Sequence, residues 1–452
     1  MENNNDTSVM NSPAGALTEI SIRVNGREEP PTREEFFTNY PFFKYWKSDS
    51  NDRLFSIDGI NIYIHIPFCI QICDYCFYMK ELVKSKTQVD DYIDHLCQEI
   101  QLVSERYSLK NRNVNSVYIG GGTPSVLTEQ QFKKLIDTLH KFHRIESPEF
   151  TFEAEPGTFT RPKLEWYKQS GVNRISMGVQ SFDDEIIRLS SRKHTSAQAI
   201  NSINMIKEAG GFAINIDLLS GLAGERMDSW ESSVTTALEQ QVDMLTIYKM
   251  KAYSNTVFYK MGVHKNEIKL PSELEEIGFM KSALRKVRAH DYQLWSTFAF
   301  TRNGYAHKYA ENTWRGQDLI AYGVSSFGKV GDINYQNLNN MDLYFEKLRN
   351  NEIPVYRSYA VTYKDKIVKE LLLCAARLSS YRKEEFIRKF GFDYFDLIPD
   401  VIGQLVEKGY IIDNKEELIL TDQGILFGDF IGKILASSVK DVLGKDAIGF
   451  KY

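Results

Sequence analysis

The chain has 452 residues, of which 42% are hydrophobic and 25% charged, and its formal net charge is −5 at pH 7. This composition is ordinary for a globular protein, and the acidic balance without a dense Lys/Arg run argues against a nucleic-acid partner. No apolar run approaches the roughly 18 residues that span a bilayer, and the start of the chain lacks a signal-peptide pattern. We therefore expect a cytoplasmic protein that is not an integral membrane protein.

Residues 1–55 are predicted to form an N-terminal extension that is partly disordered, because their first part is polar and poor in apolar residues. Aromatic side chains gather from Phe36 to Trp46. We expect a helical segment there, whose aromatic residues pack on the main body or cover a site. Packing is the commoner role for such residues.

Short apolar strands alternate with longer amphipathic segments from Ile60 to Lys249. Six such alternations predict a parallel sheet with right-handed crossovers. Polar and glycine residues at the carboxyl ends of the strands favour a closed or partial (β/α)6 barrel over a flat doubly wound sheet. The expected strands are Ile62–Ile66, Val114–Ile119, Phe150–Glu153, Arg174–Val179, Phe212–Leu219 and Met244–Tyr248.

The chain changes character beyond Pro271. A helix is expected at Leu274–His290 and a strand at Tyr292–Ser296, followed by a glycine-containing loop region to about Asn340. We divide this part of the chain into the end of a barrel domain (56–300) and a connecting or substrate region (301–359).

Residues 360–452 predict a mostly helical C-terminal domain that resembles a winged helix. The expected helices are Lys364–Leu378, Lys383–Phe390 and Leu397–Lys408, and a hairpin follows at Tyr410–Thr421 with its turn at Asp413 and Asn414. Winged helices often bind DNA, but this one alternates Lys with Glu and Asp. We therefore expect a lid or docking role.

Three of the five cysteines follow the first barrel strand with the spacing Cys69-x3-Cys73-x2-Cys76. Thiolates spaced in this way can hold three corners of a [4Fe–4S] cluster and leave the fourth iron open. A zinc site is an alternative, but zinc takes four ligands and no second cysteine pair exists. Chance clustering is the other alternative. Cys97 and Cys374 lie in apolar helical segments and are interpreted as packing residues.

Polar residues at the ends of the following strands are candidates for a site at the barrel mouth. Gly120–Gly122 can bring backbone N–H groups close to a ligand. Of Glu153 and Glu155, one can hold an ammonium or hydroxyl group, although a solvated pair beside a turn is as good an explanation. Asp217 lies in an apolar strand, where a carboxylate needs hydrogen bonds or a polar cavity. Gln180 ends another strand, and Arg192 is a candidate carboxylate clamp.

Together these motifs resemble the radical S-adenosylmethionine (SAM) superfamily. The string Tyr63-Ile-His-Ile-Pro-Phe-Cys69 is similar to the oxygen-independent coproporphyrinogen III oxidase-like (HemN-like) family in particular. Further motifs of that family are Gly120-Gly-Gly-Thr-Pro124, Glu153-Ala-Glu-Pro156, Ser176-Met-Gly-Val-Gln-Ser-Phe182, Asn215-Ile-Asp-Leu218, Tyr322-Gly-Val-Ser-Ser-Phe327 and Leu420-Thr-Asp-Gln-Gly424. The resemblance covers roughly residues 57–437.

The resemblance implies a partial (β/α)6 barrel, a [4Fe–4S] cluster held by Cys69, Cys73 and Cys76, and one or two SAM molecules. It also implies that a 5′-deoxyadenosyl radical abstracts a hydrogen atom from a substrate, after reduction by a donor such as flavodoxin or ferredoxin. The residues that match SAM-binding positions of the family are Tyr63, Tyr75, Gly121, Gly122, Thr123, Glu153, Gln180, Arg192, Asp217 and Phe327.

Members of this family differ in their reactions. The oxidase has Cys-Gly-Cys after its cluster motif, whereas this chain has Cys76-Phe77-Tyr78. The resemblance therefore favours the HemN-like methyltransferase branch, which methylates an sp2 carbon of an aromatic, quinone or tetrapyrrole substrate with a second SAM. The alternatives are coproporphyrinogen III oxidation and a heme chaperone. Trp314 and Arg315 are candidates for substrate contact or for packing, and His65 is expected to be structural.

Overall fold

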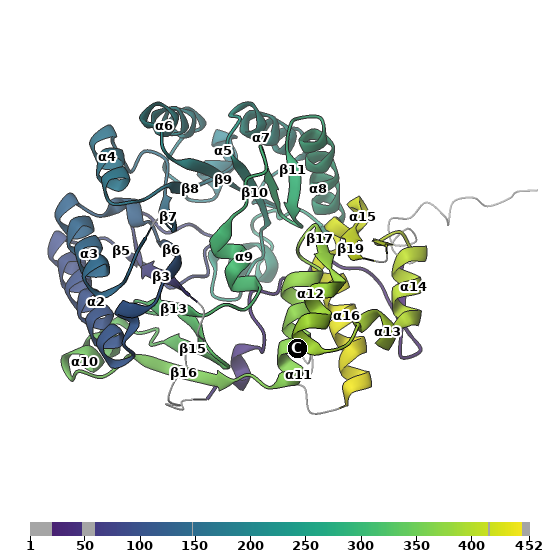
Figure 1. Ribbon diagram of the computed structural model, residues 1–452. Helices are drawn as coiled ribbons and strands as arrows, with labels where there is room; N and C mark the ends of the chain where they lie inside the picture. The colour runs from purple at the N-terminus through teal and green to yellow at the C-terminus, as the bar shows by residue number, and fades with distance from the viewer. Residues whose placement is uncertain (1–19, 48–58, 147, 415, 445–452) are drawn as a thin grey trace, which may run out of the picture.

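A curved twelve-stranded sheet forms the centre of the molecule in this computed structural model, which describes residues 20–47, 59–146, 148–414 and 416–444 (Figure 1). Six neighbouring strands of this sheet run parallel and confirm the predicted strand–helix alternation. They are β3 (Ile60–Ile66), β6 (Val114–Gly121), β7 (Glu149–Ala154), β8 (Arg174–Gln180), β9 (Ala213–Ser220) and β10 (Met244–Lys249).

Strand β3 shows how the sequence sets the two sides of this sheet. Ile60, Ile62, Ile64 and Ile66 are fully buried, while the intervening Asn61, Tyr63 and His65 hydrogen-bond to side chains or backbone across the concave side. Successive side chains of a strand point to opposite faces, so the isoleucines pack under the helices. Parallel strands are usually apolar on both faces. The polar second face therefore marks the inside of the barrel, which we call the lumen.

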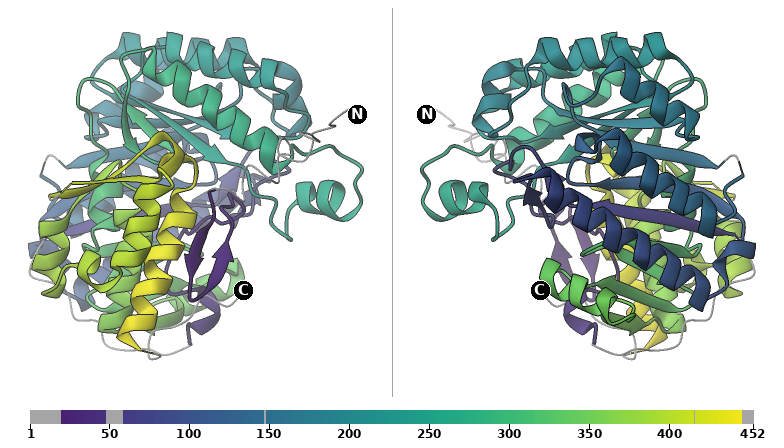
Figure 2. Two further views of the ribbon diagram at one scale, coloured as in Figure 1. Left: turned by 90° about the vertical axis from the view of Figure 1, so that its right-hand side faces the viewer. Right: turned by 90° about the vertical axis from the view of Figure 1, so that its left-hand side faces the viewer.

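Helices surround the outer side of the curved sheet (Figures 1 and 2). Thr128, Thr195 and Ser272 each begin a helix with a capping box, in which the cap and the third helical residue satisfy each other's backbone N–H groups. The covering helices are α2 (Lys86–Arg106), α3 (Glu129–Phe142), α4 (Arg161–Gln169), α5 (Asp184–Leu189), α6 (Ser196–Ala209), α7 (Met227–Glu239) and α8 (Glu273–Arg288). No described helix has the length and apolar content needed to cross a bilayer.

The region expected to be a loop up to Asn340 is in fact structured, and that prediction was wrong. Strand β13 (Leu319–Tyr322) pairs in parallel with β3 and extends the barrel sheet. Strands β11 (Gln293–Ser296) and β12 (Ala299–Thr301) extend its other end, and β14 (Phe327–Val330), β15 (Ile333–Asn337) and β16 (Val355–Ala360) follow β13. Of these strands, β11 is the one predicted at Tyr292–Ser296. Strands β12 and β13 are short and pair with β10 and β3, which are distant in sequence, so local periodicity does not reveal their place in the sheet.

A short helix, α9 (Lys308–Trp314), lies inside the ring of strands at their amino ends (Figure 1). The Asn312 side chain of this helix donates a hydrogen bond to Asn61 Oδ1 of β3. The ring centroids of Tyr309 in the helix and Tyr118 in β6 are 4.8 Å apart. The helix therefore forms the floor of the lumen.

The C-terminal part contains the predicted helices and hairpin. They are α11 (Tyr363–Glu370), α12 (Lys383–Phe390) and α14 (Pro399–Glu407), and the hairpin of β18 (Ile411–Asp413) and β19 (Glu417–Leu420). The first predicted helix continues beyond Glu370 as a π-helical turn at Leu371–Ala375. The short helix α13 (Tyr394–Leu397) and strand β17 (Ser380–Arg382), which pairs with β19, were not predicted. Residue 415, which follows the predicted turn in this hairpin, lies outside the described residues. The long α16 (Gly428–Leu443), which packs on α11, was not anticipated.

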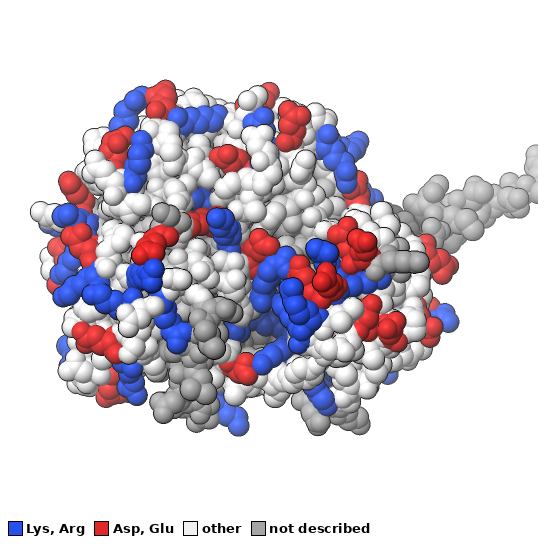
Figure 3. Space-filling model, viewed as in Figure 1, with Lys and Arg blue, Asp and Glu red and all other residues white. Residues whose placement is uncertain are grey.

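Lys and Arg gather over this C-terminal part on the face that Figure 3 shows, with Asp and Glu between them. Several of the cations are paired: Lys389 with Glu370, and Arg315 with Glu385. Such pairing weakens a continuous positive potential, as expected for a surface that does not follow a phosphate backbone.

The N-terminal segment is not the helix that we expected between Phe36 and Trp46. It is extended, with a hairpin of β1 (Ile22–Val24) and β2 (Arg27–Glu29) and one helical turn at Phe43–Tyr45. Pro41 has no backbone N–H and cannot continue a helix through this stretch. The segment packs on both parts of the chain: Arg33 donates to the Leu426 carbonyl and its own carbonyl accepts from Lys249. Residues 1–19 and 48–55 of the predicted extension lie outside the described residues.

Candidate active site

The three clustered cysteines lie on a loop at the carboxyl end of β3, which we call the cysteine loop (residues 68–80). It begins at β4 (Phe68–Cys69) and returns at β5 (Glu81–Leu82), which pairs with β4. Cys69 is buried, and Cys73 and Cys76 are half-buried. The amide of Cys76 donates to the carbonyl of Cys73, and Lys80 Nζ donates to the Cys76 carbonyl at 2.5 Å. These local bonds hold Cys73 and Cys76 on one turn at the barrel mouth, and Cys69 lies at the start of the loop in β4.

The thiols do not form a single-ion site. Among the residues that the structure describes, no three His, Cys, Asp or Glu side chains come close enough together to hold one metal ion. The ligands of a four-iron cluster bind different irons, so they need not converge on one point. Burial raises the pKa of Cys69 to about 12, and it raises the pKa of Cys73 although Arg192 acts against this. Metal ligation must therefore displace protons from these two thiols.

The glycines that end β6 let the neighbouring strand and the cysteine loop approach closely. A Cβ on Gly121, whose φ is +118°, would lie 2.6 Å from the His65 ring. A Cβ on Gly122 would lie 2.9 Å from Cys69 Sγ and 2.8 Å from the Phe68 carbonyl oxygen. Any side chain at either position would push these groups apart. The next residue, Thr123, donates its amide to the same Phe68 carbonyl.

His65 connects β3 to the cysteine loop, in agreement with the structural role expected for it. Its ring nitrogens lie 3.1 Å from the Tyr63 hydroxyl and 3.1 Å from the Met79 carbonyl. Burial lowers the pKa of His65 to about 4, so the ring is neutral at physiological pH. A neutral ring can donate to the Met79 carbonyl from one nitrogen and accept from Tyr63 at the other.

Arg192 joins the cysteine loop to β8. Its guanidinium donates to the Tyr75 hydroxyl at 2.8 Å and to the Gly178 carbonyl at 2.7 Å, and it lies 3.5 Å from Cys73 Sγ. It also forms an ion pair of 2.9 Å with Glu155, and both side chains are at most 10% exposed. In this conformation Arg192, the predicted carboxylate clamp, therefore binds a carboxylate of the chain itself, that of Glu155.

Glu153 and Glu155, adjacent in the sequence pattern, have different surroundings. Glu155 accepts from Gln71 Nε2 at 2.7 Å and pairs with Arg192. Glu153 accepts from the Tyr118 hydroxyl at 2.6 Å and from the Gly121 amide at 2.9 Å. Burial raises the pKa of Glu153 to about 7, although both hydrogen bonds oppose this shift. Glu153 is thus the carboxylate of the pair that can change protonation near neutrality.

This shift predicts a pH-dependent stability. The pKa of Glu153 rises from 4.5 to about 7 on folding, so its favourable contribution is complete below pH 4.5 and is lost as the pH rises through 7. Glu153→Gln should remove this loss and raise the unfolding free energy of the ligand-free protein by about 2 kcal/mol more at pH 8 than at pH 5. Urea unfolding at the two pH values measures this difference, with exposed Glu165→Gln as control. Equal effects at both pH values would contradict the assignment.

Asp217 and Gln180 lie on the next two strands at the mouth. Asp217 accepts from Asn215 Nδ2 at 2.8 Å and from Ser176 Oγ at 3.2 Å. Burial raises the pKa of Asp217 against these hydrogen bonds. Gln180 ends β8 in the left-handed region with a φ of +69°. The structure thus brings these two residues to the same end of the barrel as Glu153, and their cofactor roles stay predictions.

The three remaining candidates, Phe327 for SAM and Trp314 and Arg315 for substrate, each contact other side chains of the protein. Phe327 stacks on Phe43 of the N-terminal segment with ring centroids 4.7 Å apart. The Trp314 ring packs against that of Trp295 with centroids 5.2 Å apart, whereas Arg315 pairs with Glu311 and Glu385. Substrate contact is therefore open to Trp314 and not to the ion-paired Arg315 in this conformation.

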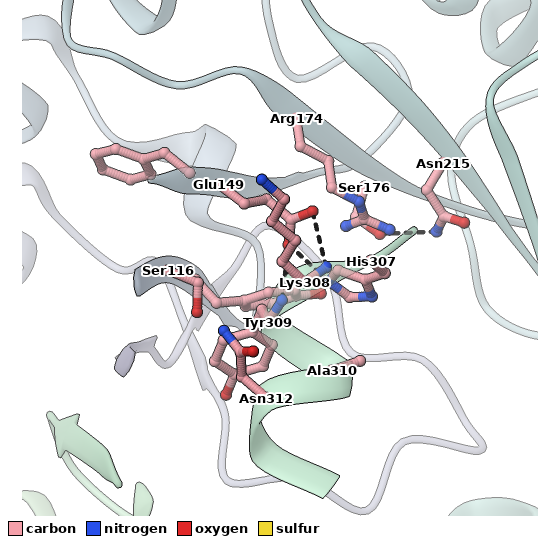
Figure 4. Close-up of polar contacts among 12 residues, drawn as sticks. Ser116, Glu149, Arg174, Ser176, Asn215, His307, Lys308, Tyr309, Ala310 and Asn312 are labelled. Atoms are coloured by element: carbon pink, nitrogen blue, oxygen red, sulfur yellow. Dashed lines mark hydrogen bonds and ion pairs between the residues drawn. The ribbon is translucent and has the colours of Figure 1, made fainter. Parts of the chain in front are cut away.

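Sequence reasoning missed the floor of the lumen, where Glu149 caps α9 (Figure 4). Its carboxylate accepts from the amides of Lys308 and Tyr309 and lies 3.6 Å from His307 Nε2. Arg174 is 2% exposed and shares this interior. Burial and the nearby Arg174 lower the pKa of His307 well below its usual value, so this imidazole is neutral. Strand alternation places Glu149 on the same face as Glu153, but no periodic signal indicates His307.

Aromatic rings line the wall of the lumen. Burial raises the pKa values of Tyr63, Tyr118 and Tyr248, yet Tyr248 keeps 37% of its surface exposed. Ring centroids are 6.1 Å apart for Tyr63–Tyr118 and 5.3 Å for Tyr248–Phe298. Flat, conjugated molecules pack well against such walls.

Comparison with known proteins gives matches over most of the chain. The model of the radical SAM superfamily matches residues 63–237. The heme chaperone HemW of Bacillus subtilis is 30% identical over 379 residues, which cover 82% of this chain and 99% of that protein. The oxygen-independent coproporphyrinogen III oxidase of Salmonella typhimurium is 26% identical, over 87% of this chain and 92% of the oxidase. The structure of coproporphyrinogen III oxidase (HemN) from Escherichia coli superimposes with a TM-score of 0.78 at 22% identity and covers 89% of this chain and 97% of HemN.

Proposed function

Because the chain belongs to the HemN/HemW-like family of the radical SAM superfamily, we propose that it binds a tetrapyrrole in the lumen, next to a [4Fe–4S] cluster and SAM. The similarity to HemW, which extends over 99% of that protein, carries this proposal. A heme-binding, chaperone-type activity is the function it favours. The cluster and SAM are the cofactors of the superfamily.

The residues at the mouth fit these cofactors. Three thiols on one loop supply the donor set of a cluster with one open iron. Gly122 leaves the space beside Cys69 Sγ that a Cβ would fill, and the buried Gln71 Oε1 has no hydrogen-bond partner among the described residues. A cluster held by these three thiols would, once reduced, supply the reductive cleavage of SAM to a 5′-deoxyadenosyl radical.

We assign the following roles to the chain's own groups. Cys69, Cys73 and Cys76 hold the cluster. The backbone at Gly121 and Gly122 and the carboxylate of Glu153 face the position next to it, where N–H groups and a carboxylate can orient the polar parts of SAM. Arg192 keeps the Tyr75 side of the cysteine loop against β8. Tyr63, Thr123, Gln180, Asp217 and Phe327 complete the proposed SAM-binding set.

Tetrapyrrole binding is supported by the lumen. Tyr63, Tyr118 and Tyr248 provide aromatic wall area, and the neutral imidazole of His307 is a ligand type that heme iron accepts. Glu149, 3.6 Å from His307 Nε2, can fix the orientation of that ring. These features suit a macrocycle better than a small polar substrate.

The comparisons do not support the methyl transfer that the sequence favoured, and they agree with its two alternatives. Oxidative decarboxylation of coproporphyrinogen III is the second candidate, because the similarity to the Salmonella oxidase extends over 92% of that enzyme. The pair Phe77-Tyr78, which replaces the Gly-Cys of the oxidase pattern, favours heme binding over this reaction.

Anaerobic reconstitution with iron, sulfide, SAM and reductant tests the proposal. We expect stoichiometric heme binding with a shifted Soret band, and 5′-deoxyadenosine formation that does not depend on coproporphyrinogen III. Release of CO2 from coproporphyrinogen III would support the second candidate instead. Transfer of a labelled methyl group from CD3-SAM, without heme binding, would overturn both.

His307→Gln should weaken heme binding at least about tenfold, because one iron–imidazole bond contributes more than the roughly 1.4 kcal/mol that a tenfold change requires. Titration of heme into the reconstituted protein, followed by the Soret band, measures the affinity. His143→Gln is the matched control, since His143 is a second buried histidine that contacts Tyr322 away from the floor. Equal affinities for wild type and His307→Gln would exclude His307 as the ligand.

A further inference from the structure

A projecting arm formed by residues 251–270 has no role in the functions proposed above. It leaves the barrel after β10, contains one short helix at Tyr259–His264, and projects from the body (Figure 2). Val257 and Val263 are 42% and 56% exposed on it. These valines add apolar surface to the arm, which matters only together with the apolar surface beside it.

The root of the arm packs on the cysteine loop. The amide of Phe258 donates to the Asp74 carbonyl at 3.1 Å, and Asn255 Nδ2 donates to the Phe77 carbonyl at 3.2 Å. The rings of Tyr253 and Phe77 lie 4.2 Å apart. The arm therefore stands next to the loop that carries the three thiols.

The cysteine loop presents apolar side chains to solvent, and the arm presents apolar and basic ones. Ile70 and Ile72, between the cluster cysteines, are 46% and 40% exposed. The arm has four lysines and one glutamate, a net charge of +3, although the whole chain has −5. Lys260 and Lys265 are exposed. An apolar centre with a charged rim is typical of protein interfaces, and a positive rim attracts acidic partners.

We propose that the arm and the exposed part of the cysteine loop form the docking face for a small acidic one-electron carrier protein. This inference rests on the proposed function, because the cluster that it serves must be reduced by one electron. That electron leaves the carrier, which is oxidised, and reaches the cluster, which is reduced. A partner on this face lies next to Cys73 and Cys76, and its acidic surface complements the lysines. Weak, charge-steered contacts of this kind suit a carrier that must dissociate.

The test measures the binding of flavodoxin, an acidic carrier, to the full-length chain with and without reconstituted cluster. We expect salt-sensitive binding at about 0.02 M salt that is lost at about 0.3 M. The double variant K260E/K265E should bind flavodoxin roughly tenfold more weakly. Its cluster should be reduced by dithionite at the wild-type rate but more slowly by reduced flavodoxin.

The control K110E/K141E makes the same charge change at the amino ends of the barrel strands and should match wild type. The neutral variant K260Q/K265Q should give an intermediate loss and guards against misfolding of the charge-reversed arm. Equal flavodoxin binding by wild type and K260E/K265E, or equal loss in the control, would overturn the inference. Binding to phosphatidylglycerol vesicles distinguishes an acidic membrane from an acidic protein as the partner. If K260E/K265E lost binding to these vesicles but still bound flavodoxin like wild type, the inference would also be overturned. Failure of cluster assembly in all variants, with the binding pattern intact, would count against the proposed function alone.

Discussion

Cys76→Ser is expected to abolish cluster assembly and SAM cleavage. The variant removes one of three thiolates, and a hydroxyl is a poor iron ligand at neutral pH. Cys76 is half-buried, so the substitution leaves the fold intact. After anaerobic reconstitution, iron should fall from about four atoms per chain to near background, and 5′-deoxyadenosine formation should disappear with it. Iron and sulfide analysis, together with electron paramagnetic resonance of the reduced protein, measure the result.

Cys97→Ser is the matched control for this variant, because Cys97 is also half-buried but lies on α2, away from the cysteine loop. It should retain wild-type iron and sulfide. If Cys76→Ser kept its cluster, or if Cys97→Ser lost it, the assignment of the three ligands would be wrong.

The strand–helix alternation of the barrel was predictable because each of these strands and helices has its own local pattern of apolar and polar residues. Each parallel strand is a short apolar run, and the ends of the observed strands differ from the predicted ones by two residues or fewer. The mouth was predictable for a related reason, since carboxyl ends of parallel strands meet at one edge of a sheet. The sequence could therefore place Gly121, Glu153 and Asp217 at the same end of the barrel, although it did not reveal their contacts.

The remainder depends on contacts between distant parts of the chain. The pairing of β13 with β3 joins residues more than 250 positions apart, and α9 owes its place to the carboxylate of Glu149. Neither contact leaves a periodic trace in the sequence. The N-terminal segment is fixed by Lys249 and Leu426 instead of by its own helical tendency. Nonlocal packing overrode local propensity at these places.

Sequence alone also could not separate the two glutamates at the end of β7. Glu155 is two residues from Glu153, and both match a polar strand end. The structure separates them because Arg192 neutralises Glu155, while Glu153 has only uncharged hydrogen-bond donors. The difference in their neighbours makes Glu155 part of the support for the cysteine loop, while the ligand role of Glu153 stays a prediction.

Arg192→Gln should be the most destabilising single substitution at the mouth. It leaves Glu155 without its cation in a site where both side chains are at most 10% exposed, and it removes the donors to Tyr75 and Gly178. Breaking a buried pair from one side costs about 3–5 kcal/mol. Urea unfolding of the ligand-free chain measures this loss. The exposed pair of Arg226 with Asp228 offers a control, since Arg226→Gln should cost at most about 1 kcal/mol.

The double variant E155Q/R192Q decides between a support role and a ligand role for Arg192. Two neutral amides leave no uncompensated charge, so part of the stability lost in Arg192→Gln should return, with a coupling free energy of about 0.5–3 kcal/mol. If Arg192 only supports the cysteine loop through Glu155 and Tyr75, SAM affinity should recover together with stability. If Arg192 also contacts SAM, stability should recover while SAM affinity stays low. Two independent, additive losses of stability would contradict the ion pair itself, and with it the link between β8 and the three thiols.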